Sequence, residues 1–204
     1  MDEKSSKNLE TLAREILRAK GIRTFDCGRP LGDVEHDLRV FYAAQVMASG
    51  KIPQTLPFDR IASVARWMCG AGKPGLILYG GYGTGKTTML EAVKYVMDCR
   101  CNATASRIYT AEKFLPVAEA DGKNLFGLLI IDELGREPDV VKDYGNEKRP
   151  MQEMICWREK RAMPLLAATN LTEDELRAKY GEYVYDRLKS LCNRVFFDGE
   201  SFRK

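Results

Sequence analysis

The sequence of 204 residues has a single histidine, His36, and none of its six cysteines form a CxxC pair. A structural zinc site built from two ligand pairs has no counterpart in such a sequence. The cysteines are also scattered, which argues against the dense disulfide framework of small secreted proteins. We therefore expect reduced thiols, as in cytoplasmic proteins.

Long apolar runs and a strong net charge are missing as well. No stretch approaches the roughly 18–20 apolar residues of a membrane helix, and residues 1–6 lack the apolar region of a signal peptide. We expect a cytoplasmic protein with no membrane partner. The 32 Lys and Arg exceed the 29 Asp and Glu by only three, so the chain is no polybasic arm. A local basic stripe would still suffice to bind nucleic acid.

The composition that remains is that of a globular protein, with 45% hydrophobic and 30% charged residues. The length suits one ordinary domain with an appendage, or two small domains. We predict a helical, partner-binding N-terminal region with a linker over residues 1–58 and a core over residues 59–204. Its helices are expected after the N-cap Ser6 and from Asp33 to Gly50. The alternative for this region is a flank packed on the core.

From Asp59, which is expected to cap a helix, short apolar strands alternate with helical patterns. Strands are expected over residues 75–79, 107–109, 128–131, 164–168 and 194–197. Helices are expected over residues 59–68, 87–99, 151–161 and 172–180. This alternation predicts an α/β fold in which a five-stranded parallel sheet lies between helices.

The strongest motif, GGYGTGKT over residues 80–87, fits the phosphate-binding pattern GxxxxGK[ST] between a strand and a helix. Glycines let backbone N–H groups converge on phosphate oxygens. Lys86 would neutralise the β- and γ-phosphates of ATP, and Thr87 would hold Mg²⁺. The alternative is a glycine-rich turn without a ligand. The predicted nucleotide-binding residues here are Gly81, Tyr82, Gly83, Thr84, Gly85, Lys86, Thr87 and Thr88.

Two further strands end in polar residues that suit the same site. Asp132 is placed to hold Mg²⁺ through water and to contribute to nucleotide binding, and Glu133 is placed to polarise the attacking water. Alternatively, both carboxylates cap the following turn. Asn170, after the fourth strand, would lie between the phosphate loop and the acidic pair and orient that water. It could also be the N-cap of the helix near Thr172, and both roles are compatible.

These residues carry a resemblance to a known family. The phosphate loop, LLIIDELG (128–135) and TN (169–170) resemble an AAA+ ATPase. The segments YGEYVYDRL (180–188), RVFF (194–197) and SFRK (201–204) are similar to the bacterial helicase loaders of the DnaC/IstB type, over about residues 58–204. The resemblance implies an ATPase without a C-terminal lid that uses ATP and Mg²⁺. It also implies a homo-oligomer when ATP is bound, with a replicative helicase and single-stranded DNA as partners.

The resemblance assigns two arginines. Arg187 matches the arginine finger that reaches the γ-phosphate in a neighbouring subunit, where a cation stabilises developing charge. Arg203 matches the sensor arginine that contacts nucleotide within its own subunit. Judged without the resemblance, Arg187 suits a surface ion pair with Asp186, and Arg203 a frayed chain end.

The chain departs from the loader pattern in four places. Tyr183 replaces a usual arginine, residues 110–126 are shorter than the insertion that grips single-stranded DNA, and residues 136–149 are longer. Residues 1–58 show no similarity that we can name. A solvated loop is one interpretation of residues 136–149, and a DNA-facing loop is the other. Under the second, a phosphate-tracking groove would include Lys113, Lys123, Lys142, Lys148 and Arg149.

The sequence therefore favours an ATP-dependent loader that delivers a replicative helicase to single-stranded DNA. One alternative is an IstB-like ATPase that assists a transposase. Another is a nucleotide-switched adaptor with little hydrolysis. The IDEL pair and the terminal arginines disfavour a small-molecule kinase.

Overall fold

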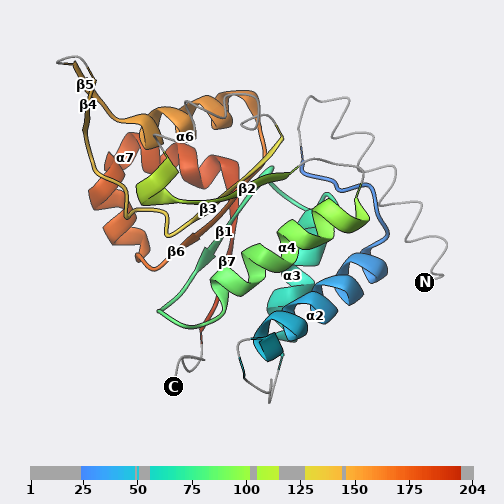
Figure 1. Cartoon of the computed structure of the whole chain (residues 1–204). Coiled ribbons are helices and arrows are strands. Elements are labelled where there is room, and N and C mark those ends of the chain that lie inside the picture. The colour runs from blue at the N-terminus through green and yellow to red at the C-terminus, as the bar shows by residue number, and fades with distance from the viewer. Residues whose placement is uncertain are drawn as a thin grey trace.

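The computed structural model describes residues 24–48, 50, 56–101, 105–114, 127–143 and 146–198. Its centre is a five-stranded, all-parallel sheet of order β2-β3-β6-β1-β7 (Figure 1), which confirms the predicted fold class. The strands are β1 (Gly75–Tyr79), β2 (Ala105–Thr110), β3 (Leu128–Asp132), β6 (Leu165–Thr169) and β7 (Cys192–Phe196).

Helices cover both faces of this sheet. One face packs against α2 (Leu31–Ala48), α3 (Phe58–Met68) and α4 (Lys86–Arg100), and the other against α6 (Pro150–Arg161) and α7 (Glu173–Leu191) (Figure 1). Alternate residues of a strand serve the two cores: Leu76 and Leu78 belong to the first, Ile77 and Tyr79 to the second. Burial on both faces explains why these strands are continuous apolar runs.

Several helix boundaries differ from the sequence prediction. The helix α2 begins at Leu31 and not at Asp33, which lies in its first turn. Pro57 is the N-cap of α3, and Asp59 lies in the first turn, so its predicted capping role is wrong. At that position its carboxylate still interacts favourably with the positive end of the helix dipole. Thr172 caps α7 through a reciprocal capping box with Glu175, and α7 continues past a kink at Gly181 to Leu191, beyond the predicted end at residue 180.

An antiparallel ribbon projects from the body between β3 and α6 (Figure 1). It consists of β4 (Val141–Asp143) and β5 (Asn146–Lys148). The exposed residues of this stretch include Lys142, Glu147, Lys148 and Arg149. The stretch is thus solvated, as one interpretation held, but it contains two short strands that were not predicted. Strand patterns are read from apolar alternation, and none of the ribbon side chains that the structure describes belongs to either core. Apolar alternation therefore does not predict these strands.

The N-terminal region is packed on the core where it is described. Val34, Leu38, Tyr42 and Val46 form the buried side of α2 and belong to the same cluster as α3 and α4. Residues 24–48 are thus a packed flank. The predicted helix after Ser6 and most of the linker lie outside the described residues, so the division at residue 58 stays a prediction.

The other sequence expectations concern membranes and thiols. Within the described ranges, no helix has both the length and the apolar character needed to cross a bilayer. All six cysteines are free, and Cys27, Cys69 and Cys192 are buried.

The packing of α2 can be tested with one buried and one exposed position. Leu38 is fully buried, whereas Val40, two residues away, is 49% exposed. We expect Leu38→Ala to lower the free energy of unfolding by about 2–5 kcal/mol, because it leaves a cavity. Val40→Ala should change it by no more than about 0.5 kcal/mol. Urea unfolding measures both, and equal small effects would contradict the packing described for α2.

Candidate functional site

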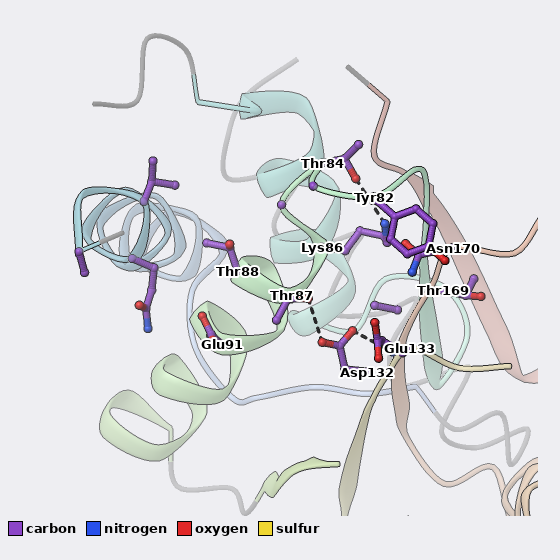
Figure 2. Close-up of a pocket in the computed structure, with 16 residues that line it drawn as sticks. Tyr82, Thr84, Lys86, Thr87, Thr88, Glu91, Asp132, Glu133, Thr169 and Asn170 are labelled. Atoms are coloured by element: carbon purple, nitrogen blue, oxygen red, sulfur yellow. Dashed lines mark hydrogen bonds between the residues drawn. The ribbon is translucent and has the colours of Figure 1, made fainter. Parts of the chain in front are cut away.

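Three strand ends create a cleft at the carboxyl edge of the sheet. The phosphate loop follows β1, Glu133 follows β3 and Asn170 follows β6, which lies between β3 and β1. The predicted placement of Asn170 between the loop and the acidic pair thus agrees with the strand order. The cleft has a volume of about 410 Å³, a size typical of small-molecule sites. The predicted residues that line it are Tyr82, Gly83, Thr84, Gly85, Lys86, Thr87, Thr88, Asp132, Glu133 and Asn170. Figure 2 labels all of these except the two glycines.

The phosphate loop presents a buried cation and an uncapped helix start. Lys86 is only 7% exposed, and its Nζ donates hydrogen bonds to the carbonyl oxygens of Gly80 at 2.7 Å and Gly81 at 2.6 Å. Gly85, in the left-handed region, precedes α4, whose first N–H groups receive no side-chain cap. Unsatisfied N–H groups at a helix N-terminus beside a lysine suit an anion such as a phosphate.

Only glycine fits at the start of this loop. Gly80 has φ of +151°, and a Cβ there would lie 2.0 Å from the carbonyl oxygen of Phe197. Phe197 in turn donates its N–H to the carbonyl oxygen of Tyr79 at 2.6 Å. Phe197, the residue after β7, therefore holds the first residue of the phosphate loop in place.

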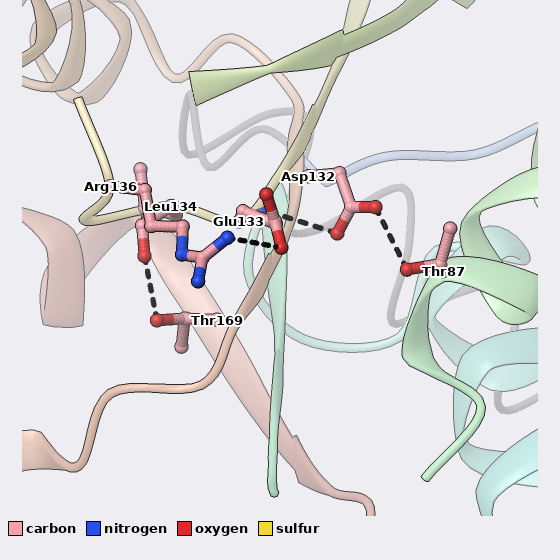
Figure 3. Close-up of polar contacts among 6 residues, drawn as sticks. All are labelled: Thr87, Asp132, Glu133, Leu134, Arg136 and Thr169. Atoms are coloured by element: carbon pink, nitrogen blue, oxygen red, sulfur yellow. Dashed lines mark hydrogen bonds and ion pairs between the residues drawn. The ribbon is translucent and has the colours of Figure 1, made fainter. Parts of the chain in front are cut away.

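A hydroxyl and a carboxylate meet where the Mg²⁺ is predicted. Thr87 Oγ1 donates to Asp132 Oδ2 at 2.8 Å, and the Glu133 N–H donates to Asp132 Oδ1 at 2.9 Å (Figure 3). Asp132 therefore binds the start of the following turn, as the capping interpretation predicts, and also faces Thr87. Its role in holding Mg²⁺ stays a prediction. Mg²⁺ takes few protein oxygens and completes its shell with water and phosphate. This donor set fits that ion.

Glu133 stands in a strained backbone position beside a cation. Its φ of +57° is in the left-handed region, which is uncommon for a residue other than glycine. Glu133 Oε1 lies 3.0 Å from Arg136 Nη1, and the guanidinium carbon lies 5.8 Å from the centroid of the Tyr82 ring. Figure 3 shows the Glu133 carboxylate turned toward Arg136, while Asp132 faces Thr87. The sequence analysis did not predict that Arg136 contacts Glu133. The spacing of three residues between them was the available signal.

At the end of β6, Thr169 has a structural role and also lines the cleft beside Asn170. Thr169 is fully buried; its hydroxyl donates to the Leu134 carbonyl at 2.7 Å and accepts from the Leu171 N–H at 3.1 Å. Asn170 lines the cleft. The suggestion that Asn170 caps the next helix is wrong, because Thr172 has that role.

One wall of the cleft was missed by the sequence analysis. Gln45, Val46 and Ala48 of α2 line it, together with Glu91 of α4. Burial, and secondarily the charge of Asp132, raise the pKa of Glu91 above its ordinary value. The α2 residues could not be foreseen, because nothing in the sequence indicates that α2 packs beside α4.

Arg187 lies outside this cleft, in a second hollow of about 370 Å³ beside Glu159 and Tyr183. Arg187 Nη1 is 2.7 Å from Glu159 Oε2, and the guanidinium carbon lies 5.1 Å from the centroid of the Tyr183 ring. The hydrogen bond and charge of Glu159 raise the pKa of Arg187. Its ion-pair partner is thus Glu159, and the pair suggested with Asp186 is wrong. The predicted site residue Arg203 lies outside the described residues.

The fold of this chain is similar to that of several solved structures. Crystal structures similar to this chain include the DnaC helicase loader, at a TM-score of 0.56 and 17% sequence identity, covering 73% of this chain and 94% of that one. Another is DnaI, at a TM-score of 0.53 and 17% identity, covering 76% of this chain and 94% of that one. The chain has the AAA+ P-loop fold. No family model and no curated protein matches the sequence.

Two neighbouring glycines of the phosphate loop give opposite expectations for stability. Gly80→Ala should lower the free energy of unfolding by at least about 1–3 kcal/mol, because it adds backbone strain and a clash with the Phe197 carbonyl. Gly81→Ala is the matched control: a Cβ at Gly81 would meet no atom within 4 Å, so stability should change little. Urea unfolding of both variants gives the comparison. A Gly80→Ala protein as stable as the Gly81→Ala protein would refute the close contact with Phe197.

Proposed function

We propose that this protein is an ATP-hydrolysing DNA replication protein, a loader that delivers a replicative helicase to single-stranded DNA. The observation that carries the proposal is the convergence of Lys86, the Thr87–Asp132 pair and Glu133 in one cleft. The structural likeness to the DnaC helicase loader and DnaI supports the replication context.

Under this proposal, each cleft residue has a part in ATP hydrolysis. The phosphates would lie along the loop, where Lys86 exchanges its loop carbonyls for phosphate oxygens. Mg²⁺, held by Thr87 and through water by Asp132, would neutralise charge on the phosphates. Glu133 would accept the proton of the attacking water, which Asn170 orients. Arg203 would contact the nucleotide of its own subunit.

Assembly would complete the site. In the proposed oligomer, Arg187 of one subunit would reach the γ-phosphate held by its neighbour. Arg187 is 39% exposed and paired to one carboxylate, so its ion pair with Glu159 is open to solvent and contributes little to stability. It can therefore be exchanged for a phosphate at small cost. Cross-linking of the full chain with and without ATP would detect the assembly.

Partner binding is assigned to residues 1–58, with residues 24–48 already docked on the core. Affinity capture with the full chain separates the leading proposal from the transposase-accessory alternative, according to whether a hexameric helicase or a transposase is recovered. A nucleotide-switched adaptor with little hydrolysis is favoured by one specific observation. Both candidate catalytic charges, Glu133 and Arg187, are paired within the chain.

Two substitutions separate binding from hydrolysis. Lys86→Ala should weaken ATP binding by at least about 100-fold, because it removes a buried cation from the phosphates. Glu133→Gln should bind ATP like the wild type while its kcat falls by about 10²–10⁴-fold, because general-base catalysis is lost. Fluorescent-nucleotide titration and steady-state ATPase assays provide the two readouts. Equal turnover in the wild type and Glu133→Gln would reject Glu133 as the water activator.

DNA binding is proposed through exposed basic residues of the ribbon and its neighbours. Lys142, Lys148 and Arg149 lie on or beside the β4–β5 ribbon, Lys113 ends a 3₁₀ turn after β2, and Lys123 lies outside the described residues. With ATP present, affinity for single-stranded DNA should fall with salt, with a log–log slope of about −0.7 for each phosphate contacted. Lys142→Ala should reduce this slope by about one such step. Filter binding across a salt series tests this, and no binding at low salt would end the proposal.

A further inference from the structure

The turn after β3 fixes Arg136 relative to Glu133. The Arg136 N–H donates to the Glu133 carbonyl at 3.0 Å, and Gly135 between them has φ of +99°. The Leu134 N–H donates to the Ala168 carbonyl at 2.8 Å, and its own carbonyl accepts the Thr169 hydroxyl at 2.7 Å. Both the N–H and the carbonyl of Leu134 thus bind β6 and hold the turn in place. The turn brings the Arg136 side chain back beside Glu133.

The Arg136 side chain bridges the acidic pair and the phosphate loop. Its guanidinium contacts Glu133 on one side and lies over the ring of Tyr82 on the other. The guanidinium is always charged in proteins, so it attracts the ionised Glu133 carboxylate at any working pH. Tyr82 belongs to the loop that receives phosphates, so a change in that loop acts on the same guanidinium.

We propose that Arg136 is a positioning residue that restrains Glu133 in the nucleotide-free chain, so that this ion pair opens before Glu133 can activate water. The inference rests on the proposed ATPase function. A general base needs a free oxygen within hydrogen-bond reach of the proton it accepts. The Oε1 atom of Glu133 is paired with a cation that also offsets the carboxylate's charge and keeps the side chain turned toward Arg136 (Figure 3). Arg136 is 46% exposed, so this restraint is weak enough to open during turnover.

A second ion pair in the chain is a matched control for the general effect of losing an exposed arginine. Arg177 lies 3.0 Å from Glu182, is 47% exposed, and sits over the Tyr185 ring at 5.1 Å. These features nearly equal those of Arg136, yet Arg177 lies on α7 and does not line the cleft. A general effect of losing an exposed arginine would therefore appear in both variants.

Steady-state ATPase assays of full-length Arg136→Gln, Arg177→Gln and the wild type, with saturating Mg²⁺ and ATP, test the proposal. We expect Arg136→Gln to raise kcat by about two- to fivefold with unchanged KM; fivefold corresponds to about 1 kcal/mol. Arg177→Gln should match the wild type. Arg136→Lys should show a smaller rise, because lysine keeps the charge but loses the planar fork of donors. The rise should disappear in the double variant with Glu133→Gln, which shows that it acts through Glu133.

An Arg136→Gln kcat equal to or below that of the wild type would overturn the restraint, as would an equal rise in Arg177→Gln. If Glu133→Gln abolishes turnover while Arg136→Gln is no faster than the wild type, this inference alone fails. If the wild type and Glu133→Gln turn over equally, the proposed function fails instead. A wild type that is inactive while Arg136→Gln hydrolyses ATP would support the restraint. Inactivity of both would overturn the restraint together with the ATPase proposal.

Discussion

The parallel register of β1, β6 and β3 is the constraint on which the candidate site depends. Ala167 of β6 pairs with Ile77 on one side and Ile131 on the other, so the three strands end at nearly the same level. A slip of one residue would move a strand end by about 3.3 Å and turn its side chains to the opposite face. Either change would break the 2.8 Å hydrogen bond between Thr87 and Asp132. The packing that fixes this register therefore also fixes the chemistry.

The buried charge of Lys86 imposes a second requirement. A buried ammonium needs partners, and the Gly80 and Gly81 carbonyls supply them. The loop is therefore already wrapped around a cation before any phosphate arrives. Its shape is held from outside by Phe197, whose backbone contacts both Tyr79 and Gly80. A ligand would thus exchange partners with Lys86 in a preformed loop, which reduces the ordering cost of binding.

Sequence reasoning succeeded where local pattern and tertiary environment agree. Strands buried on both faces are apolar runs, and the phosphate loop has a fixed spacing, so the sheet and most cleft residues were predictable. Arg158 shows the limit. It begins the charged run from Arg158 to Arg161, yet it is 1% exposed and donates to the Gly127 and Pro164 carbonyls. Burial lowers its pKa to about 10, so it remains charged at neutral pH. Neither this contact nor the docking of α2 has a local sequence signal, because both depend on distant backbone.

The two arginine–glutamate pairs near the proposed chemistry share one physical property. Arg136–Glu133 and Arg187–Glu159 each pair a residue of the proposed chemistry with an opposite charge, and each arginine is more than one third exposed. Solvent-exposed pairs of this kind contribute little to folding, so stability alone gives no strong reason for them. Their positions matter more, because each pair engages a charged group, Glu133 or Arg187, that ATP hydrolysis in the proposed oligomer would use. In the proposed mechanism, activation is therefore an exchange of ionic partners at the cleft and at the subunit contact. The sheet and the phosphate loop would keep their shape throughout.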